Sequence, residues 1–587
     1  MVCVTSIYTS GPLSAKVAFV GEAYGEMEEA LGTPFHPKAP AGRELTHWLN
    51  VAGLSREEVY IDNAVTEHPP RNDMACFYTI TTQGRLKKGP RWGDFLQYVG
   101  ALKGRLEKCQ ANVIVALGGT ALLALYGNLD ADSSDSRPSV SKLRGSILES
   151  TLLPGRKLIC TFHPSPRNWN AKKDQENASG ITPEQRFFAM QDMMRIKGDS
   201  EFSEMRLPVR ELVTLWDMDS VRSQIDLFPC SLVALDIETC NDEVSHISFS
   251  WDSRRAYVIP FWTPYNNVWS MAEEALLWGW IGKMVEEIPC VGHNIQFDAY
   301  YLWKKFGIRV NVAHDTMAGF HIAYPGLPKD LGTLVSLYTR EPYYKDDGGD
   351  YKVNPENEEK FLRYSALDAA VLHDILPGVL RDLKAQGNLE VYENTIKLVE
   401  PVLFMQAKGI RLDMDRRSRL ATYYRKLEEH ITRYIERKVG LSLNPNSQRE
   451  CVAYFHGEKA YLKTFGGWPK NEELAGKIKK LCAISEKFPP STKDGKITAD
   501  KKAMNKLSER GSQIASLFVK AKACGKFVST FCEYPVLDGR SRSSINICGA
   551  VSGRFSAEGF KDVNKVIVEG TNHQNPPHAI KVCWLAD

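Results

Sequence analysis

The sequence predicts a multidomain α/β protein in which two α/β domains precede a mainly helical region. The 587 residues are too many for one hydrophobic core, so three or four domains are expected. Apolar runs alternate with helical stretches in residues 12–195 and again from residue 231 to about residue 380, which is typical of α/β domains. From about residue 386 the pattern changes to long amphipathic helices. An apolar content of 43% and a charged content of 25% are ordinary for a globular protein.

Four strand-like runs organise the first domain: KVAFVGE, EVYIDNAV, ANVIVALGG and KLICTFHP. Each run ends in small or polar residues, and open α/β sheets bind their ligands just beyond the strand ends. Functional side chains are therefore expected directly after these runs. A polar and charged stretch follows, and we interpret residues 196–207 as a linker. The first domain is thus predicted to span residues 1–195.

The second α/β segment places acidic residues beside its strands. LVALDIETC has Asp236 and Glu238 two residues apart on a strand, so that both carboxylates point to one face. VGHNIQFDAYYL brings Asp298 after a second short strand. FLRYSALDAAVL has Tyr364 and Asp368 four residues apart, a spacing that shares one helix face.

Four carboxylates and a phenol from distant segments suit one task, which is to hold two hard divalent cations through oxygen ligands. Two such ions about 4 Å apart stabilise both the attacking and the leaving oxygen of phosphodiester hydrolysis. Each motif alone has a simpler interpretation, because an acidic pair is usually solvated surface charge. The three motifs in order, each beside the expected strand or helix, favour the metal site.

This segment resembles the DEDD-type 3′–5′ exonucleases, in the subgroup that has Tyr in the third motif. The resemblance covers about residues 208–385 and implies an RNase H-like exonuclease domain. It implies that two Mg²⁺ or Mn²⁺ ions are bound and that Tyr364 orients the attacking water. The implied metal ligands are Asp236, Glu238, Asp298 and Asp368. Asp315, in HDTMAG, also fits the family pattern, as a structural contact.

Residues 386–587 contain a long amphipathic stretch, MDRRSRLATYYRKLEEHITRYIERKV, followed by LNPNSQRE, AKACGKFVSTF, SGRFS and TNHQNPP. This order resembles the thumb and early palm of family A DNA polymerases, in which a TGR segment precedes an NLQN-P segment. The resemblance implies that phosphate and minor-groove contacts grip a DNA template–primer. The implied DNA-binding residues are Lys526, Arg554, Gln574 and Asn575. Because the net charge is only +3, DNA binding has to come from such local groups.

In the polymerase family, the strand that carries the first catalytic Asp follows shortly after the position of Asp587. The sequence therefore predicts a polymerase interrupted inside the palm, by a split gene or by truncation. The expected partner is a second chain that supplies the polymerase active site, and a processivity factor is a further candidate partner. The apolar run from Ile580 to Leu585 is expected to lack sheet partners within this chain.

The first domain resembles the uracil-DNA glycosylase superfamily, on the segments VAFVGEAYGEMEEALGTPFHPKAPAGREL, EVYIDNAVTEHPPRND, VIVALGGTAL, KLRGS and TFHPSPRN. The resemblance implies an α/β/α sandwich with a pocket for a base flipped out of the stack. In that pocket Phe35 would stack on the base and Asn63 would read its edge. Glu22 would position water, and His163 would stabilise the departing pyrimidine.

The domain departs from the iron–sulfur branch of this superfamily, which it otherwise resembles. That branch has a Cys just before Pro-Pro, where this chain has Glu67 and His68. The thirteen Cys form no CxxC pair, so no iron–sulfur cluster is expected. Their thiols are expected to be reduced, as in a cytoplasm. Tyr24 replaces a Pro of the family pattern, and Ala23 stands where another branch has a water-activating Asp. Recognition of uracil is therefore expected to exceed its excision.

Together these features predict the front part of a replicative, phage-like DNA polymerase with proofreading and base-inspecting modules. One alternative is a DNA-binding accessory subunit with a vestigial nuclease, and another is an RNase D-like RNA processor. The intact acidic set argues against the first, and the ordered thumb-like segments argue against the second. The longest apolar stretch, NVIVALGGTALLALYG, is interrupted by Gly-Gly and too short to span a bilayer, so no membrane association is expected.

Overall fold

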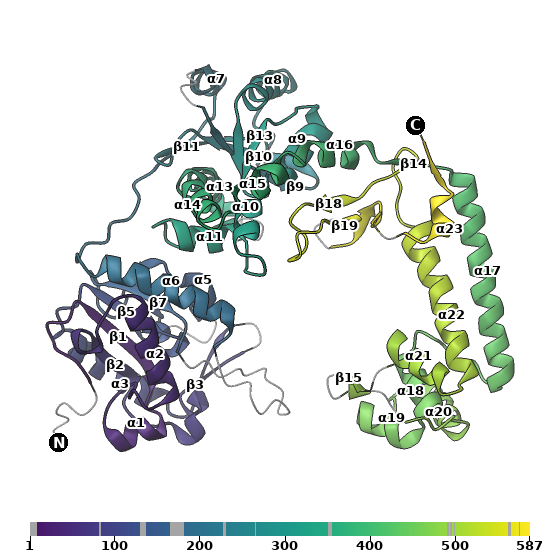
Figure 1. Ribbon diagram of the computed structural model, residues 1–587, viewed down its shortest axis with the longest axis horizontal. Coiled ribbons are helices and arrows are strands. Elements are labelled where there is room, and N and C mark those ends of the chain that lie inside the picture. Colours follow the sequence, from purple (N-terminus) through teal and green to yellow (C-terminus); the bar gives the residue numbers. More distant parts are fainter. Residues whose placement is uncertain are drawn as a thin grey trace. The chain divides into compact units, whose positions relative to one another are not determined.

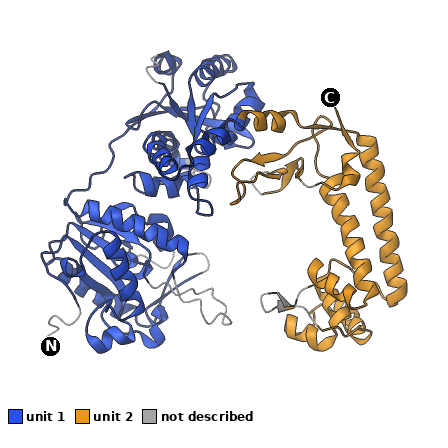
Figure 2. Cartoon of the chain, in the orientation of Figure 1, with its two compact units in different colours: residues 1–399 blue, residues 400–587 orange. Residues whose placement is uncertain are grey.

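The computed structural model divides into two compact units, residues 1–399 and 400–587 (Figure 2). Each unit is described by itself. The described residues are 9–81, 84–129, 137–164, 181–226, 231–263, 266–349, 355–489, 492–493, 496–497, 499–561, 565–574 and 576–586.

A five-stranded sheet forms the centre of the first domain (Figure 1). Its first four strands are parallel, and the last is antiparallel to its neighbour. The four predicted strand-like runs all lie in this sheet. In spatial order the strands are β2 (Tyr60–Val65), β1 (Val17–Ala23), β5 (Val113–Leu117), β7 (Lys157–Thr161) and β6 (Ile147–Glu149).

Helices cover both faces of this sheet. On one face, Trp48 of α2 (Pro40–Val51) and Met193 of α6 (Pro183–Asp199) share a core with alternate strand residues such as Phe19. On the other, α3 (Trp92–Leu106) and α4 (Gly119–Tyr126) pack on the remaining alternate residues. Side chains of successive strand residues point to opposite faces, so both faces must be apolar. The predicted α/β/α sandwich is confirmed.

A mixed six-stranded sheet forms the second domain (Figure 1). The three strands β9, β10 and β11 run antiparallel, and β12 and β13 continue the sheet parallel to β9. This architecture agrees with the predicted RNase H-like fold. In spatial order the strands are β13 (Val312–Asp315), β12 (Cys290–Gly292), β9 (Val233–Cys240), β10 (Glu243–Ser250), β11 (Arg255–Pro260) and β8 (Glu211–Thr214).

The helices of the second domain lie against this sheet as the amphipathic patterns require. Apolar residues of α8 (Met271–Glu287) share a core with those of β9 and β10. Helix α13 (Glu358–Ala370) places Leu362 and Ala366 against β11. Helix α9 (Ile295–Phe306) follows β12, and it begins at Asn294, whose φ of 62° lies in the left-handed region.

Two helices, α6 and α15, do not respect the domain boundaries expected from the sequence. Helix α6 ends at Asp199, inside the stretch expected to be a linker. Helix α15 (Leu389–Ile396) begins after residue 385, yet its Tyr392 hydroxyl accepts a hydrogen bond from the Asp315 backbone N–H at 3.0 Å. This helix therefore packs with the second domain, and the first compact unit continues to Val399.

Two long helices dominate residues 400–587 (Figure 1). Helix α17 spans Met414–Val439, the bounds of the predicted amphipathic stretch, and it packs along α22 (Gln513–Phe527). The Asp413 side chain accepts from the Arg416 N–H at 2.8 Å and caps the helix start. Smaller helices share a core with one end of this pair: α18 (Gln448–His456), α19 (Glu458–Phe465), α20 (Glu472–Ala483) and α21 (Lys501–Glu509).

The apolar run near the C-terminus has sheet partners within the chain, so the expectation that it lacks them is wrong. Strand β22 (Trp584–Leu585) pairs antiparallel with β14 (Ile410–Leu412), which also pairs with β17 (Arg540–Ser541). The chain returns after the helices to the strand that precedes them, a long-range pairing with no local sequence signal. None of the helices in the described part of the chain has both the length and the apolarity to cross a membrane.

Candidate functional site

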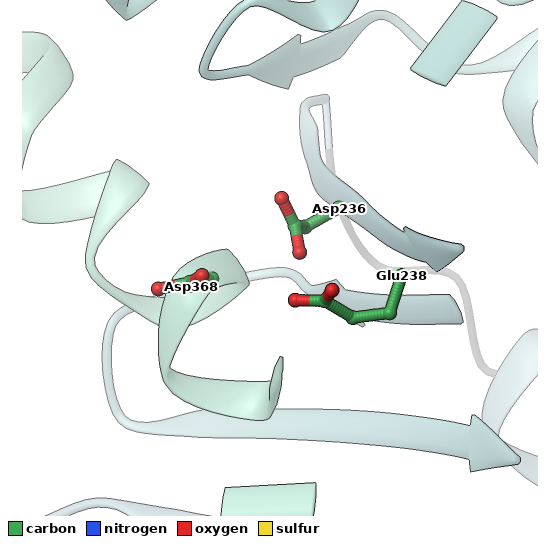
Figure 3. Close-up of side chains that lie close together, drawn as sticks. All are labelled: Asp236, Glu238 and Asp368. Atoms are coloured by element: carbon green, nitrogen blue, oxygen red, sulfur yellow. The ribbon is translucent and has the colours of Figure 1, made fainter. Parts of the chain in front are cut away.

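Three acidic side chains converge in the second domain (Figure 3). Asp236 and Glu238 stand on one face of β9, as their spacing predicts, and Asp368 projects from α13. One carboxylate oxygen of each lies within 4.8 Å of the others. Oxygen atoms at these distances suit a hard divalent cation.

Asp236 has the strongest requirement for a cation. Its Oδ2 is buried and has no hydrogen-bond partner among the described residues. Burial, and then the charges of Asp368, Asp298 and Glu238, raise the pKa of Asp236 well above its ordinary value. A buried, unpaired carboxylate oxygen is costly, and a bound cation would remove that cost. The residues present therefore fit a divalent metal.

Asp298, the fourth predicted ligand, contacts the backbone of β9, the strand that carries Asp236 and Glu238. Its Oδ1 accepts a hydrogen bond from the Ile237 backbone N–H, between Asp236 and Glu238, at 2.9 Å. Burial raises the pKa of Asp298 well above its ordinary value. The structure thus brings three predicted ligands together and places the fourth against the strand that carries two of them.

Tyr364 lies on the same helix as Asp368, and a loop contacts both. Lys345 Nζ donates to Tyr364 Oη at 2.9 Å and to Asp368 Oδ2 at 2.5 Å. Tyr344 Oη donates to Asp368 Oδ1 at 2.7 Å. Sequence reasoning missed Lys345 and Tyr344, because their segment, EPYYKDDGG, matches none of the motifs and approaches the site only through the fold.

Asp315 has the structural role that the sequence indicated. Its Oδ1 accepts hydrogen bonds from the backbone N–H groups of Met317 at 2.9 Å, Ala318 at 3.1 Å and Asn294 at 3.1 Å. It caps α10 (Thr316–Ala323) and fixes the turn into α9, the helix that carries Asp298.

A second group of predicted residues gathers in the first domain, where β1 and β2 end. Gly21 and Asn63 are register partners on these strands. A Cβ at Gly21 would lie 2.3 Å from Asn63 Oδ1 and 2.4 Å from the Phe35 ring, so only glycine leaves this space open. The rings of Phe35 and His163 have centroids 5.5 Å apart. Two of the four predicted pocket residues, Asn63 and Phe35, therefore border Gly21, and a third, His163, lies beside Phe35.

Asn63 and Phe35 are held in unusual states. Asn63 is fully buried, and both side-chain polar atoms lack a hydrogen-bond partner among the described residues. Phe35 has a φ of 47°, and Arg56 donates to its carbonyl oxygen at 2.5 Å. Unpaired buried amides and left-handed backbone at a non-glycine residue are found at binding sites, where a ligand supplies the missing interaction.

Glu22 is held on the other side of β1. Thr120 Oγ1 donates to its carboxylate, and Tyr78 Oη lies 2.6 Å from the same Thr120 oxygen. Burial raises the pKa of Tyr78 to about 12, so its hydroxyl keeps its proton. The carboxylate is thus fixed in direction at the end of the strand that also carries Gly21.

Comparison with known proteins assigns the first domain to a protein superfamily. Residues 8–183 match the uracil DNA glycosylase superfamily. The type-4 uracil-DNA glycosylase of Thermotoga maritima is 36% identical over 155 residues, which are 26% of this chain and 67% of the relative. That of Archaeoglobus fulgidus is 32% identical over 156 residues, 26% of this chain and 68% of the relative. The chain belongs to the uracil-DNA glycosylase superfamily through this domain.

The second domain has a family match of its own. Residues 227–384 match the 3′–5′ exonuclease domain of the DNA polymerase A type. The predicted order of a glycosylase-like domain and an exonuclease domain is confirmed, and exonucleases of this class use divalent metal ions. Among solved structures, the chain is similar to the POL domain of Pol1 from M. smegmatis in complex with DNA primer-template and dNTP. That match has a TM-score of 0.43 and 16% identity, and covers 64% of this chain and 58% of the other.

The glycosylase-like domain has an ion-pair network where the iron–sulfur branch has a thiolate. Glu67 Oε1 accepts from Arg91 at 2.6 Å, and Glu67 Oε2 accepts from Tyr98 at 2.5 Å. The Arg91 guanidinium lies over the Phe77 ring, 4.9 Å from its centroid. These contacts join the segment before Pro-Pro to α3 without sulfur, and the residues at this position do not fit a metal cluster.

The predicted DNA-binding residues lie in residues 400–587. Lys526, in the last turn of α22, and Arg554 are exposed. Gln574 Nε2 donates to the carbonyl oxygen of Phe555 at 2.6 Å, which places Gln574 beside Arg554. Asn575 lies outside the described residues.

Proposed function

We propose that this chain removes nucleotides from DNA 3′ ends and recognises uracil, as part of a family A DNA polymerase. The observation that carries the first activity is the group of Asp236, Glu238 and Asp368 in a domain that matches the 3′–5′ exonuclease family. Within the part of the chain that the structure describes, the buried Oδ2 of Asp236 has no hydrogen-bond partner.

These three side chains would hold Mg²⁺ or Mn²⁺, and Asp298 would complete the acidic set. The ions, when bound, stabilise charge on the attacking and leaving oxygens. Burial, and then the charges of Asp368 and Glu238, raise the pKa of Tyr364 well above its ordinary value. Its hydroxyl therefore keeps its proton and orients an attacking water by hydrogen bonding.

The test is digestion of a 5′-labelled single-stranded oligonucleotide in Mg²⁺ or Mn²⁺. An Asp236→Ala, Glu238→Ala double variant should be slower by at least about 10³-fold, or about 4 kcal/mol in activation free energy. DNA binding should largely persist. Glu359→Ala, at an exposed carboxylate of α13, is the matched control and should digest at the normal rate. Equal rates for the double variant and the native protein would refute the nuclease assignment.

A second function, recognition of uracil, is favoured by the amide of Asn63, which has no hydrogen-bond partner among the described residues. An asparagine amide offers one acceptor and two donors, which complement the N–H and C=O groups on the edge of uracil. Phe35 offers an aromatic face beside it, and His163 a nitrogen for the departing base. Because Ala23 cannot activate water, we infer that recognition exceeds excision.

This proposal is tested by binding of uracil- and cytosine-containing oligonucleotides to the Asp236→Ala variant, which protects the DNA from digestion; thymine presents the same edge as uracil and would not test Asn63. A uracil preference of about 1–3 kcal/mol is expected, and Asn63→Ala should remove it. Abasic products are assayed in parallel. Equal affinity for both bases, with no abasic product, would reduce the domain to a docking module. Robust excision that Asn63→Ala abolishes would make it a working glycosylase.

The remaining proposals concern the polymerase context. We infer that Lys526, Arg554, Gln574 and Asn575 grip a primer–template, and that the exonuclease domain extends through α15 to about residue 399. A second chain with the polymerase active site, a processivity factor, a phage source and a cytoplasmic location stay predictions from the sequence. An accessory subunit without catalysis and an RNase D-like nuclease are the alternatives, and the digestion assay separates the first of them from the proposal.

A further inference from the structure

One loop of the exonuclease domain brings a positive charge into the carboxylate group. The loop, residues 341–349, follows α11 (Leu331–Tyr338) and precedes η4 (Pro355–Asn357) and α13 in the sequence, and its last three residues are helical. The Lys345 ammonium contacts Asp368 Oδ2 and Tyr364 Oη, and it lies 4.2 Å from the centroid of the Tyr364 ring. Tyr344 binds the other oxygen of Asp368. Both oxygens of a proposed metal ligand are therefore engaged by neighbouring residues of one loop.

This placement is built into the fold. At the base of the loop, Glu341 is buried and accepts from the buried Arg210 side chain at 2.8 Å. Near its end, a Cβ at Gly348 would lie 2.6 Å from Tyr364 Cζ, so only glycine lets the backbone close onto that ring. The loop is thus anchored on one side and packed against Tyr364 on the other.

We propose that Lys345 is a resident cation of the exonuclease site, which competes with divalent metal for Asp368 and positions the Tyr364 hydroxyl. This role rests on the proposed exonuclease function. Three carboxylates with oxygens within 4.8 Å repel one another, and one ammonium offsets part of that repulsion. A divalent ion that binds Asp368 Oδ2 has to displace the ammonium, so metal and lysine oppose each other with a reciprocal coupling free energy.

The second part of the role concerns Tyr364. An ammonium has donors only, so its hydrogen bond occupies a lone pair of Tyr364 Oη and leaves the phenolic O–H to point elsewhere. Lys345 therefore restricts the direction in which Tyr364 presents its proton to water. Lys345 is a positioning residue in this account, since it acts through Asp368 and Tyr364.

Metal binding without DNA gives the first test. Mn²⁺ binding to the full chain is measured by calorimetry and electron paramagnetic resonance, and Asp368→Asn identifies the signal of this site. Lys345→Met keeps the length of the side chain and removes its charge, and it should bind Mn²⁺ at least about fivefold more tightly. Lys345→Arg should stay close to the native affinity. Lys360→Met, at an exposed lysine of α13, is the control and should change nothing.

Unchanged or weaker Mn²⁺ binding by Lys345→Met would overturn the competition. If that variant does not fold, as judged by circular dichroism, Lys345→Gln is measured instead, with the same expectation. These results do not depend on nuclease activity. Native-rate digestion by the Asp236→Ala, Glu238→Ala variant would refute the proposed function, and the Mn²⁺ measurement would still decide the role of Lys345.

Kinetics at saturating Mn²⁺ give the second test. If Lys345 positions Tyr364, Lys345→Met should lower kcat for single-stranded DNA by about 10–100-fold and leave KM nearly unchanged. The effect should be absent in a Tyr364→Phe background, because the hydroxyl that Lys345 contacts is already missing. An unchanged kcat, or an equal loss in both backgrounds, would overturn the positioning role.

Discussion

Asp236 links protons, metal and stability at the scale of a single residue. Burial and three neighbouring carboxylates raise its pKa above the value it has in the unfolded chain, and the Lys345 charge opposes this only in part. Between the two pKa values the folded protein holds more protons than the unfolded chain. The free energy of unfolding therefore falls as the pH rises through this interval, unless a cation is bound.

From this we predict that Asp236→Asn stabilises the metal-free protein at pH 8. The neutral amide removes the buried charge, and each kcal/mol gained raises Tm by about 2–4 °C. Near pH 4 the advantage should vanish, because the folded protein then holds Asp236 protonated. Thermal unfolding in EDTA at both pH values measures this, with Glu359→Gln as an exposed control. A lower Tm for Asp236→Asn at pH 8 would contradict the pKa argument.

The residues predicted from the sequence are those whose partners follow from local geometry. Asp236 and Glu238 share a face because strands alternate, and Tyr364 and Asp368 share one because helices repeat every 3.6 residues. Lys345 reaches Asp368 through a loop whose path depends on the buried pair of Arg210 and Glu341. No spacing rule encodes such a contact, so the sequence could not predict it.

At the scale of elements, too, the sequence predicts what local signals determine and misses what depends on distant residues. Helix α17 carries its own signals, namely an amphipathic pattern, the Asp413 cap and Gly440 in a left-handed conformation at its end, and its bounds agree with the prediction. Strand β22 is two residues long, and its identity as a strand depends on β14, which lies far away in the sequence. The expectation of an unpaired C-terminal run was wrong for this reason.

Element pairing also shows how space for the proposed uracil pocket arises. The parallel register sets Gly21 of β1 beside Asn63 of β2. Because Gly21 has no side chain, space remains next to the Asn63 amide for the proposed ligand. The motifs predict which residues line the proposed pocket, and the register brings Gly21 beside one of them, Asn63. Glu67 shows the opposite: its contacts are with Arg91, just before α3, and with Tyr98 on α3, and no motif indicated either residue.

At the scale of the whole molecule, the glycosylase-like and exonuclease domains form one compact unit. Buried Arg144 of the first domain donates to Asp192 at 2.5 Å and to Ser336 of the second at 2.9 Å. Arg340 of the second domain donates to Asp199 of α6 at 2.7 Å. Because buried charges need well-placed partners, these contacts bind the two domains to each other. The two domains for which base recognition and strand hydrolysis are proposed thus belong to one compact unit.

Residues 400–587 have a different task in this proposal, which is to hold DNA by charge. Each lysine or arginine that neutralises a phosphate releases counterions, so the dependence of affinity on salt counts such contacts. We predict that a Lys526→Ala, Arg554→Ala double variant binds primer–template DNA more weakly, whatever the DNA sequence. The slope of log K against log salt should become shallower by about 1–2. Fluorescence anisotropy from low to moderate salt, with nuclease-deficient protein, measures both quantities.

Lys459→Ala, at an exposed lysine of α19, is the matched control for this measurement and should leave the slope unchanged. The exonuclease rate on short single strands at saturating DNA should also stay unchanged, because neither Lys526 nor Arg554 contributes to the carboxylate site. A slope equal to that of the native protein would show that both residues face solvent in the complex. The DNA path would then have to be sought on another surface of the chain, which a chain of net charge +3 can offer only where its basic residues cluster.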